Sequence, residues 1–338
     1  MTRRSRVLCW SVAAVAALLT AVVLIYAANR TTTPASPLEK LVLAVPTQPA
    51  VANVWFAHAQ GYFREEGLDV TLQPHATGRQ ALAATMEGKA DVAVAADTPI
   101  VFASLQRQPI AILATIYQSS LYSAVAARKD RGIREIADLK GKRIGVAFGT
   151  SADLFLDTLL ATHGMGRTDV ARVNVGPDGV LDALVKGEVD AVSTWIPHTN
   201  QIRAKFGDAA LIFNDQAIYT LTFNMVSMRA TAQQRPDTVK RLLKAMIKSE
   251  EYIKSHPREA LTTAARALAM EPALVIEVIN PQDFTVNLTQ SLLVTLEDHA
   301  RWAIKHELSD AKQVPNYLEF LFPDSLAALK PRAVTVIR

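Results

Sequence analysis

The chain has 338 residues, of which 50% are hydrophobic and 20% charged, and this composition excludes a disordered protein and leaves room for two hydrophobic cores or one large α/β body. The net charge of +4 equals the charge of Arg3, Arg4, Arg6 and Arg30, and residues 1–30 contain no acid. The remainder of the chain is therefore neutral overall. It has no basic face with interleaved aromatic residues, so we expect no nucleic-acid partner.

Residues 7–28 form an uncharged, strongly apolar run behind the first arginines. As a helix it would extend about 33 Å, which is enough to cross a bilayer core. A cleavable signal usually has a shorter apolar core and small residues at its cleavage site, whereas this run ends with Tyr26 before two alanines. We therefore predict an uncleaved anchor over residues 1–30, with a cleaved signal as the alternative. The arginines place the body outside the cytoplasm.

A polar spacer over residues 31–37 separates this anchor from the folded body, which we expect to begin at Leu38. The single cysteine, Cys9, lies within the anchor region and is interpreted as a small apolar residue of a membrane helix. One cysteine permits no intramolecular disulfide.

The body begins with alternating strand and helix patterns. This alternation predicts a mainly parallel sheet covered by helices on both faces. The expected strands are 41–45, 68–72 and 91–95, and the expected helices are 51–63, 79–87 and one that starts at Asp97-Thr98-Pro99.

The stretch 142–160 combines three local signals. Apolar residues 144–148 predict a strand, Gly149-Thr150-Ser151 interrupts it, and Leu154 opens an amphipathic helix. Such a turn directs free backbone N–H groups and the positive end of the helix dipole at one point, which suits an anion or a polar ligand head. The alternative is an ordinary helix cap, because Ser and Thr are preferred there.

An internal repeat links the two halves of the body. Residues 82–94 (LAATMEGKADVAV) are echoed by residues 181–193 (LDALVKGEVDAVS), and Leu41 onward is echoed by Lys142 onward at nearly the same offset. This spacing is the size of a domain, far above solenoid periods. Two similar α/β lobes follow, with a ligand expected between them at the carboxyl ends of the strands.

Two strands are expected to connect the lobes, one at 123–127 and one returning at 221–228. They divide the body into a first lobe of residues 38–122 and 222–338 and a second lobe of residues 123–221. Helices at 239–255, 258–270, 273–279 and 288–305 would complete the first lobe, and residues 333–337 form a short strand or an ordered tail.

The sequence shows no signature of the common catalytic or metal sites, such as G-x-S-x-G, GxGxxG, GxxxxGK[ST] or H-E-x-x-H. His299 and His306 are seven residues apart, and an exposed helix surface is the favoured interpretation. We expect no enzyme activity, no metal and no cofactor.

Binding features are more persuasive. Three loops should emerge at the same edge of the sheet, at Thr47-Gln48, Thr77-Gly78 and Asp97-Thr98. The alternative for Asp97 is that it only caps the helix that follows. Trp195 ends a strand beside Pro197, where it could cover a pocket or pack between lobes. Trp55 and His58 suit the core or the rim of a cleft.

Four segments together resemble the NMT1/THI5-like and SsuA/TauA-like substrate-binding proteins of ABC transporters. They are WFAHAQGYFREEGLDV from Trp55, EGKADVAVAADTP, IREIADLKGKRIGVAFGTSA from Ile133 and VKGEVDAVSTWIPH from Val185. The resemblance implies the two-lobed fold of type II periplasmic binding proteins. It departs from relatives at Ile196, where many have an acid.

The resemblance also implies which residues bind. The ligand-binding residues would be Thr47, Gln48, Ala50, Thr77, Gly78, Asp97, Thr98, Gly149, Thr150, Ser151, Ala152, Trp195 and Asn224. The ligand would be a small anionic or heteroaromatic solute, such as a sulfonate, nitrate or a pyrimidine. The partners would be an ABC permease and its ATPase, with the membrane held through the N-terminal helix, and the protein would be a monomer.

Two alternatives differ in class. A membrane-tethered receptor would bind ligand and signal without transporting it. Some THI5-like relatives resemble pyrimidine-phosphate synthases, but those have a cysteine-rich iron motif that a chain with only Cys9 cannot supply.

Overall fold

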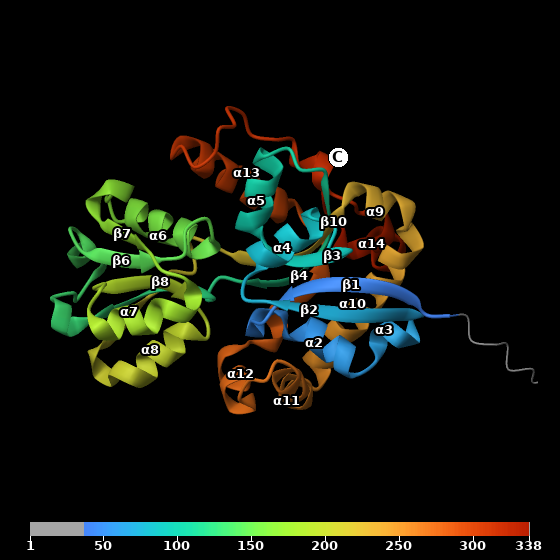
Figure 1. Ribbon diagram of the computed structural model, residues 1–338, viewed down its shortest axis with the longest axis horizontal. Coiled ribbons are helices and arrows are strands. Elements are labelled where there is room, and N and C mark those ends of the chain that lie inside the picture. The colour runs from blue at the N-terminus through green and yellow to red at the C-terminus, as the bar shows by residue number, and fades with distance from the viewer. Residues whose placement is uncertain (1–36, 338) are drawn as a thin grey trace, which may run out of the picture. The chain divides into compact units, whose positions relative to one another are not determined.

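The computed structural model describes residues 37–337. The expected anchor and nearly all of the spacer lie outside these residues. Within the described part, no helix combines the length and apolar character that crossing a membrane requires. The folded body comprises Glu39 onward and contains two separate sheets (Figure 1).

The first sheet has six strands and mixes parallel and antiparallel pairs. β1 pairs parallel with β2 and β3, while β10 runs antiparallel between β3 and β4. The four strands expected from the sequence are confirmed, but β4 and β11 were not predicted. The order is β11 (Phe284–Asn287), β4 (Ile110–Ser119), β10 (Leu221–Met228), β3 (Val92–Ala96), β1 (Glu39–Pro46) and β2 (Leu68–His75).

The second sheet has five strands, and all of them come from the middle of the chain. Its centre is the parallel pair β6 and β8, with β5 antiparallel beside β8. The order is β7 (Ala171–Asn174), β6 (Arg143–Val146), β8 (Ala191–Trp195), β5 (Ser123–Arg128) and β9 (Ala210–Phe213). We call the six-stranded sheet with its helices the first lobe and the five-stranded sheet with its helices the second lobe.

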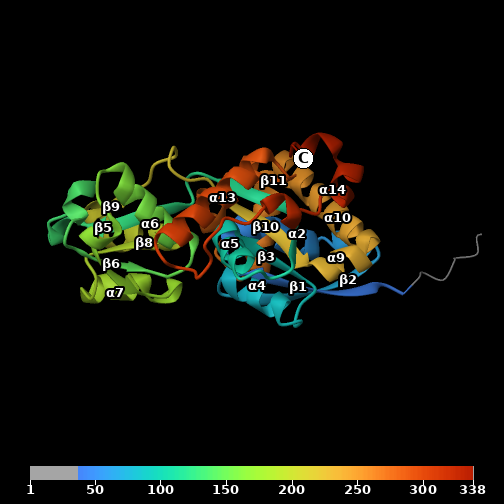
Figure 2. The ribbon, with the colours of Figure 1, turned by 90° about the horizontal axis from the view of Figure 1, so that it is seen from above.

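Helices cover both sheets. In the first lobe α10 packs on α2 and α13 packs on α5 (Figure 2). The helices are α2 (Ala52–Ala59), α3 (Tyr62–Glu65), α4 (Gly78–Met86), α5 (Asp97–Leu105), α6 (Ser151–Thr162), α7 (Val180–Lys186), α8 (His198–Phe206), α9 (Arg229–Gln234), α10 (Pro236–Ser255), α11 (Pro257–Ala267), α12 (Pro272–Val278), α13 (Gln290–Lys305) and α14 (Asp324–Leu329). Residues 333–337 contain no strand; Val334 makes an isolated bridge to Leu288.

Two expectations about helices were wrong. The single helix expected over 51–63 is instead a short 3-10 turn (Pro49–Val51) followed by α2 and α3. Gly61, which adopts a left-handed conformation with φ of 75°, separates α2 from α3. His299 was expected on an exposed surface but is only 5% exposed. It lies one turn from Leu296 on the face of α13 that packs into the lobe.

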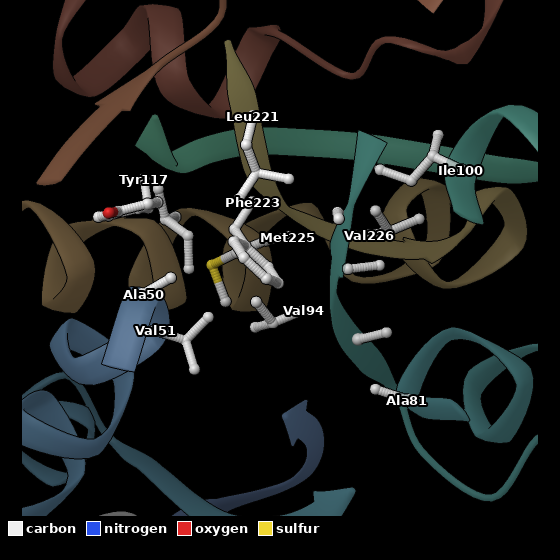
Figure 3. Packing of buried hydrophobic residues seen from close by; sticks show 14 of the residues in the cluster. Ala50, Val51, Ala81, Val94, Ile100, Tyr117, Leu221, Phe223, Met225 and Val226 are labelled. Atoms are coloured by element: carbon white, nitrogen blue, oxygen red, sulfur yellow. The ribbon is translucent and has the colours of Figure 1, made fainter. Parts of the chain in front are cut away.

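The core of the first lobe brings the first loop and the return strand together. Figure 3 shows Ala50 and Val51 in the same cluster as Phe223 and Met225 of β10. Ala50 is therefore buried beneath the sheet edge from which the binding loops emerge.

The internal repeat has a structural basis, which is a pair of hydrogen bonds that we call a clip. In each lobe the clip joins a residue of one strand to an aspartate that leads into the neighbouring parallel strand. Asp91 N–H donates to Val42 O at 2.9 Å, and Val42 N–H donates to Asp91 Oδ2 at 2.7 Å. In the second lobe Asp190 and Arg143 make the same pair of bonds at 2.8 and 3.0 Å. The glycines before these aspartates, Gly88 and Gly187, have φ of 73° and 72°, which favours glycine at both.

The clip in the second lobe predicts a pH dependence of stability. The hydrogen bond from the Arg143 side chain lowers the pKa of Asp190 below its ordinary value. A carboxylate whose pKa is lower in the folded than in the unfolded protein stabilises the fold at pH values above its unfolded pKa of about 3.9. This contribution is lost as the pH falls through the pKa of the folded state. We expect Asp190→Asn to lower the free energy of unfolding by about 1 kcal/mol at neutral pH. The difference in the free energy of unfolding between this variant and the unaltered protein should become smaller in acid.

Urea unfolding between neutral pH and pH of about 3 measures this difference. Asp182→Asn is the control, because Asp182 is an exposed residue whose ion pair with Lys186 spans one helical turn. A destabilisation of Asp190→Asn that stayed constant down to the lowest pH would contradict the prediction.

Candidate functional site

Side chains from both lobes meet around a small cavity at the carboxyl ends of the strands. The cavity has a volume of about 20 Å³, so the lobes nearly meet at this point. Six of its lining residues are among those predicted from the sequence, namely Gln48, Thr77, Gly78, Thr150, Ser151 and Trp195. The others were not predicted; they are Arg79, Ala96, Pro99, Tyr122 and Phe223.

The second lobe contributes the N-terminus of α6. Thr150 occupies the N-cap position, but its hydroxyl donates to Ala147 O at 2.7 Å and does not cap the helix. The backbone N–H groups of Ser151 and Ala152 belong to the first turn and have no acceptor within the helix. Gly149 N–H is already bound to Asp153 Oδ2 at 2.9 Å. The first turn of α6 therefore leaves backbone donors without an acceptor in the helix, and Thr150 and Ser151 of this segment line the cavity.

The first lobe contributes the N-terminus of α4. Thr77 and Gln80 form a capping box, in which the Thr77 hydroxyl accepts from Gln80 N at 3.2 Å. Thr77 therefore lines the cavity, while its hydroxyl caps the N-terminus of α4. A side chain at Gly78 would come within 3.0 Å of Ala95 Cα, so glycine is required for α4 to approach β3 this closely.

Two buried aromatic side chains with a polar atom lie in the cavity wall. Trp195 is 4% exposed, and its Nε1 makes no hydrogen bond to any described residue. Tyr122 is 2% exposed, and its Oη lies beside the backbone of Ala50. Burial raises the pKa of Tyr122, so its hydroxyl keeps its proton. Buried polar groups normally have partners, so the Trp195 N–H is available to a group that accepts hydrogen bonds.

Two hydrogen bonds join the lobes, and the first of them is made by Arg79 of the cavity wall. Arg79 Nη1 donates to Phe148 O at 3.1 Å, and Trp302 Nε1 donates to Asp157 Oδ2 at 2.9 Å. Arg79 directly follows the predicted binding loop Thr77-Gly78, and this position next to the loop is the signal in the sequence by which it could have been found. Among the described residues lining the cavity, Arg79 supplies the positive charge and none is acidic.

The structure does not bring Asp97 to the cavity. Asp97 is fully buried and accepts hydrogen bonds from Thr98 N, Tyr219 Oη and Thr222 N at 2.7, 2.7 and 2.9 Å. Its carboxylate therefore fixes the start of α5 to the chain that leads into β10.

Other expected binding residues also lie outside the cavity. Asn224 is buried and is bonded to Thr115 and Thr222, and the Ala152 carbonyl accepts from Ser193. Thr47 and Gly149 line neighbouring hollows, while Ala50 and Thr98 are buried. Trp55 is partly buried against the core, and His58 Nε2 lies 3.1 Å from Val70 O; neither lines the cavity.

Arg79 gives a direct test of the charge in this site. We expect Arg79→Met to weaken the binding of a small organic anion about tenfold, since a charge-assisted contact contributes on that order. Calorimetric titration measures the change. Lys89→Met is the matched control, because Lys89 is an exposed cation on the same lobe that is paired with Glu87. Equal losses in the two variants would show that Arg79 acts only through overall charge.

The chain matches the family model described as NMT1/THI5 like over residues 48–260. It is 29% identical over 158 residues to a Brucella abortus protein named as a binding protein, covering 46% of this chain; the chain spans about half, 50%, of that relative's length. It is 22% identical over 260 residues to a Bacillus subtilis protein named as an aliphatic sulfonates-binding protein, covering 76% of this chain and 77% of the relative.

A solved structure shares the fold. The alkanesulfonate-binding protein SsuA from Xanthomonas axonopodis pv. citri, bound to MOPS, superposes with a TM-score of 0.73 at 20% identity, over 84% of this chain and 98% of that one. The predicted two-lobed α/β fold is therefore confirmed. The chain belongs to the NMT1/THI5-like family, and its two sheets have the fold of the periplasmic binding proteins.

Proposed function

We propose that this protein is an extracytoplasmic solute-binding protein that captures a small organic anion between its lobes and delivers it to an ABC permease and its ATPase. The observation that carries the proposal is the buried Trp195 Nε1, which has no partner among the described residues and lines the same cavity as Tyr122, Thr150 and Ser151 at the start of α6. Helix N-termini favour anions, and a sulfonate offers three acceptor oxygens to such donors. The names of the sulfonate-binding relatives support the same class.

Capture requires the lobes to separate, since a cavity of about 20 Å³ is smaller than any organic solute. We propose a hinge motion at the two connections between the sheets, with closure completing the donor set around the ligand. The closed shape is then the one that the permease recognises. No catalytic step is proposed.

Thermal unfolding of the full-length protein with a panel of probes tests this function. Ethanesulfonate, nitrate, acetate and a neutral pyrimidine represent the ligand classes, and ethylammonium is the cationic control. We expect at least one anion to raise the melting temperature with concentration as mass action requires, and ethylammonium to have no effect. A panel in which no anion stabilised the protein would refute the proposal.

The membrane tether is a separate part of the proposal. Sequencing the N-terminus of the mature protein tests it, with the native start expected for an anchor. A mature chain that began near residue 29 would show a cleaved signal.

A further inference from the structure

A second and larger cavity lies where α13, α6 and the connection into β10 meet. Its volume is about 550 Å³, and it shares no lining residue with the cavity around Trp195 among the residues described. Thr295 and His299 line it from α13, Thr158 from α6 and Thr220 from the connection. Both lobes and the segment between them therefore contribute to one wall.

His299 in this wall is buried without a hydrogen bond. Its Nδ1 is inaccessible and lies 3.7 Å from Asp97 Oδ1, too far for a hydrogen bond, and neither ring nitrogen bonds to any described residue. Burial lowers the pKa of His299, which keeps the imidazole neutral. The nearby carboxylate favours the proton on Nδ1, so Nε2 is left as an acceptor at the cavity. A ligand that donates a hydrogen bond would satisfy it.

The charges around the cavity differ from those around the first one. Among the described lining residues none is Lys or Arg, and Asp298 is the charged one. An anion is therefore disfavoured, which sets this cavity apart from the one beside Arg79. The hydroxyls of Thr220 and Thr295 have no hydrogen-bond partner among the described residues and are available as donors and acceptors.

We propose that this cavity is a second binding site for a small uncharged ligand with several hydroxyl groups, such as a polyol, held by His299 Nε2 and the hydroxyls of Thr220 and Thr295. A hydroxyl group of a polyol can donate a hydrogen bond to the imidazole nitrogen. Its other hydroxyl groups can donate to and accept from the threonine hydroxyls. A cavity of this volume accommodates a molecule of this size.

Because both lobes line the site, an occupant would favour the arrangement in which they lie together. This coupling rests on the proposed anion-binding function, whereas the site itself does not. An anion in the first cavity and a polyol in the second are then expected to strengthen each other's binding by the same factor.

Calorimetric titration of the full-length protein with xylitol tests the site. We expect saturable binding at millimolar concentrations, weakened about tenfold by Thr295→Val, which removes one hydroxyl at nearly constant volume, and by His299→Leu. Thr71→Val is the matched control, because Thr71 is exposed on the edge strand of the same lobe.

Several outcomes would overturn the site. Xylitol that did not saturate, or that bound equally well to the Thr295→Val and His299→Leu variants, would exclude it. Binding of the cationic amino alcohol ethanolamine in place of xylitol would show that the ligand class is wrong. Xylitol binding in a protein that bound no anion would leave this site standing while the proposed function failed.

Discussion

Replacement of Thr150 and Ser151 together by alanine is expected to weaken anion binding by about two orders of magnitude, because two charge-assisted contacts at the start of α6 are lost or displaced. Ser151 loses a hydroxyl in the cavity wall. Thr150 loses the bond to Ala147 O that holds the loop in place, so the first-turn N–H groups also lose their alignment. Titration with the best anion of the panel measures the effect.

A matched double variant controls for the loss of two hydroxyls. Ser255→Ala with Thr262→Ala removes hydroxyls that bond to helical carbonyls of α10 and α11, and neither residue lines the cavity. It should bind the anion as the unaltered protein does. If the Thr150 and Ser151 variant kept full affinity, the start of α6 would not be the anion site.

Asp97→Ala is expected to lower the free energy of unfolding by about 2–5 kcal/mol, because removal of a buried acceptor leaves several donors without partners. Tyr219 Oη and Thr222 N both donate to this carboxylate inside the first lobe. Asp97→Asn retains one acceptor oxygen and should cost less. Unfolding in urea, followed by tryptophan fluorescence, measures both variants.

Asp208→Ala serves as the control, since Asp208 is exposed in a short turn between α8 and β9. Its effect should stay within about 0.5 kcal/mol. An Asp97→Ala variant as stable as this control would mean that the hydrogen bonds around Asp97 contribute nothing net.

The sequence allowed most of the parallel strands to be predicted, because their apolar runs are short and bounded by turns. β4 was missed because an unbroken apolar run does not distinguish a buried strand from a buried helix. The repeat identified two lobes because glycine and aspartate recur at the same places in both.

The site was predictable only where one local pattern determines it. Thr150 and Ser151 follow from a strand that turns into a helix, and Trp195 from the end of a strand. The start of α5 at Asp97 was also predicted, but its partners, Tyr219 and Thr222, lie more than a hundred residues later and only the folded chain brings them there. The burial of His299 likewise depends on which face of α13 meets α5.

The clips of Asp91 to Val42 and of Asp190 to Arg143 have a consequence for motion. Each clip begins and ends within one sheet, so separation of the lobes breaks neither of them. Among the described residues, single hydrogen bonds from Arg79 to Phe148 and from Trp302 to Asp157 join the lobes, and α5 of the first lobe also packs on α6 of the second. The proposed hinge motion would therefore leave both clips intact, and it would have to separate α5 from α6 together with these two hydrogen bonds.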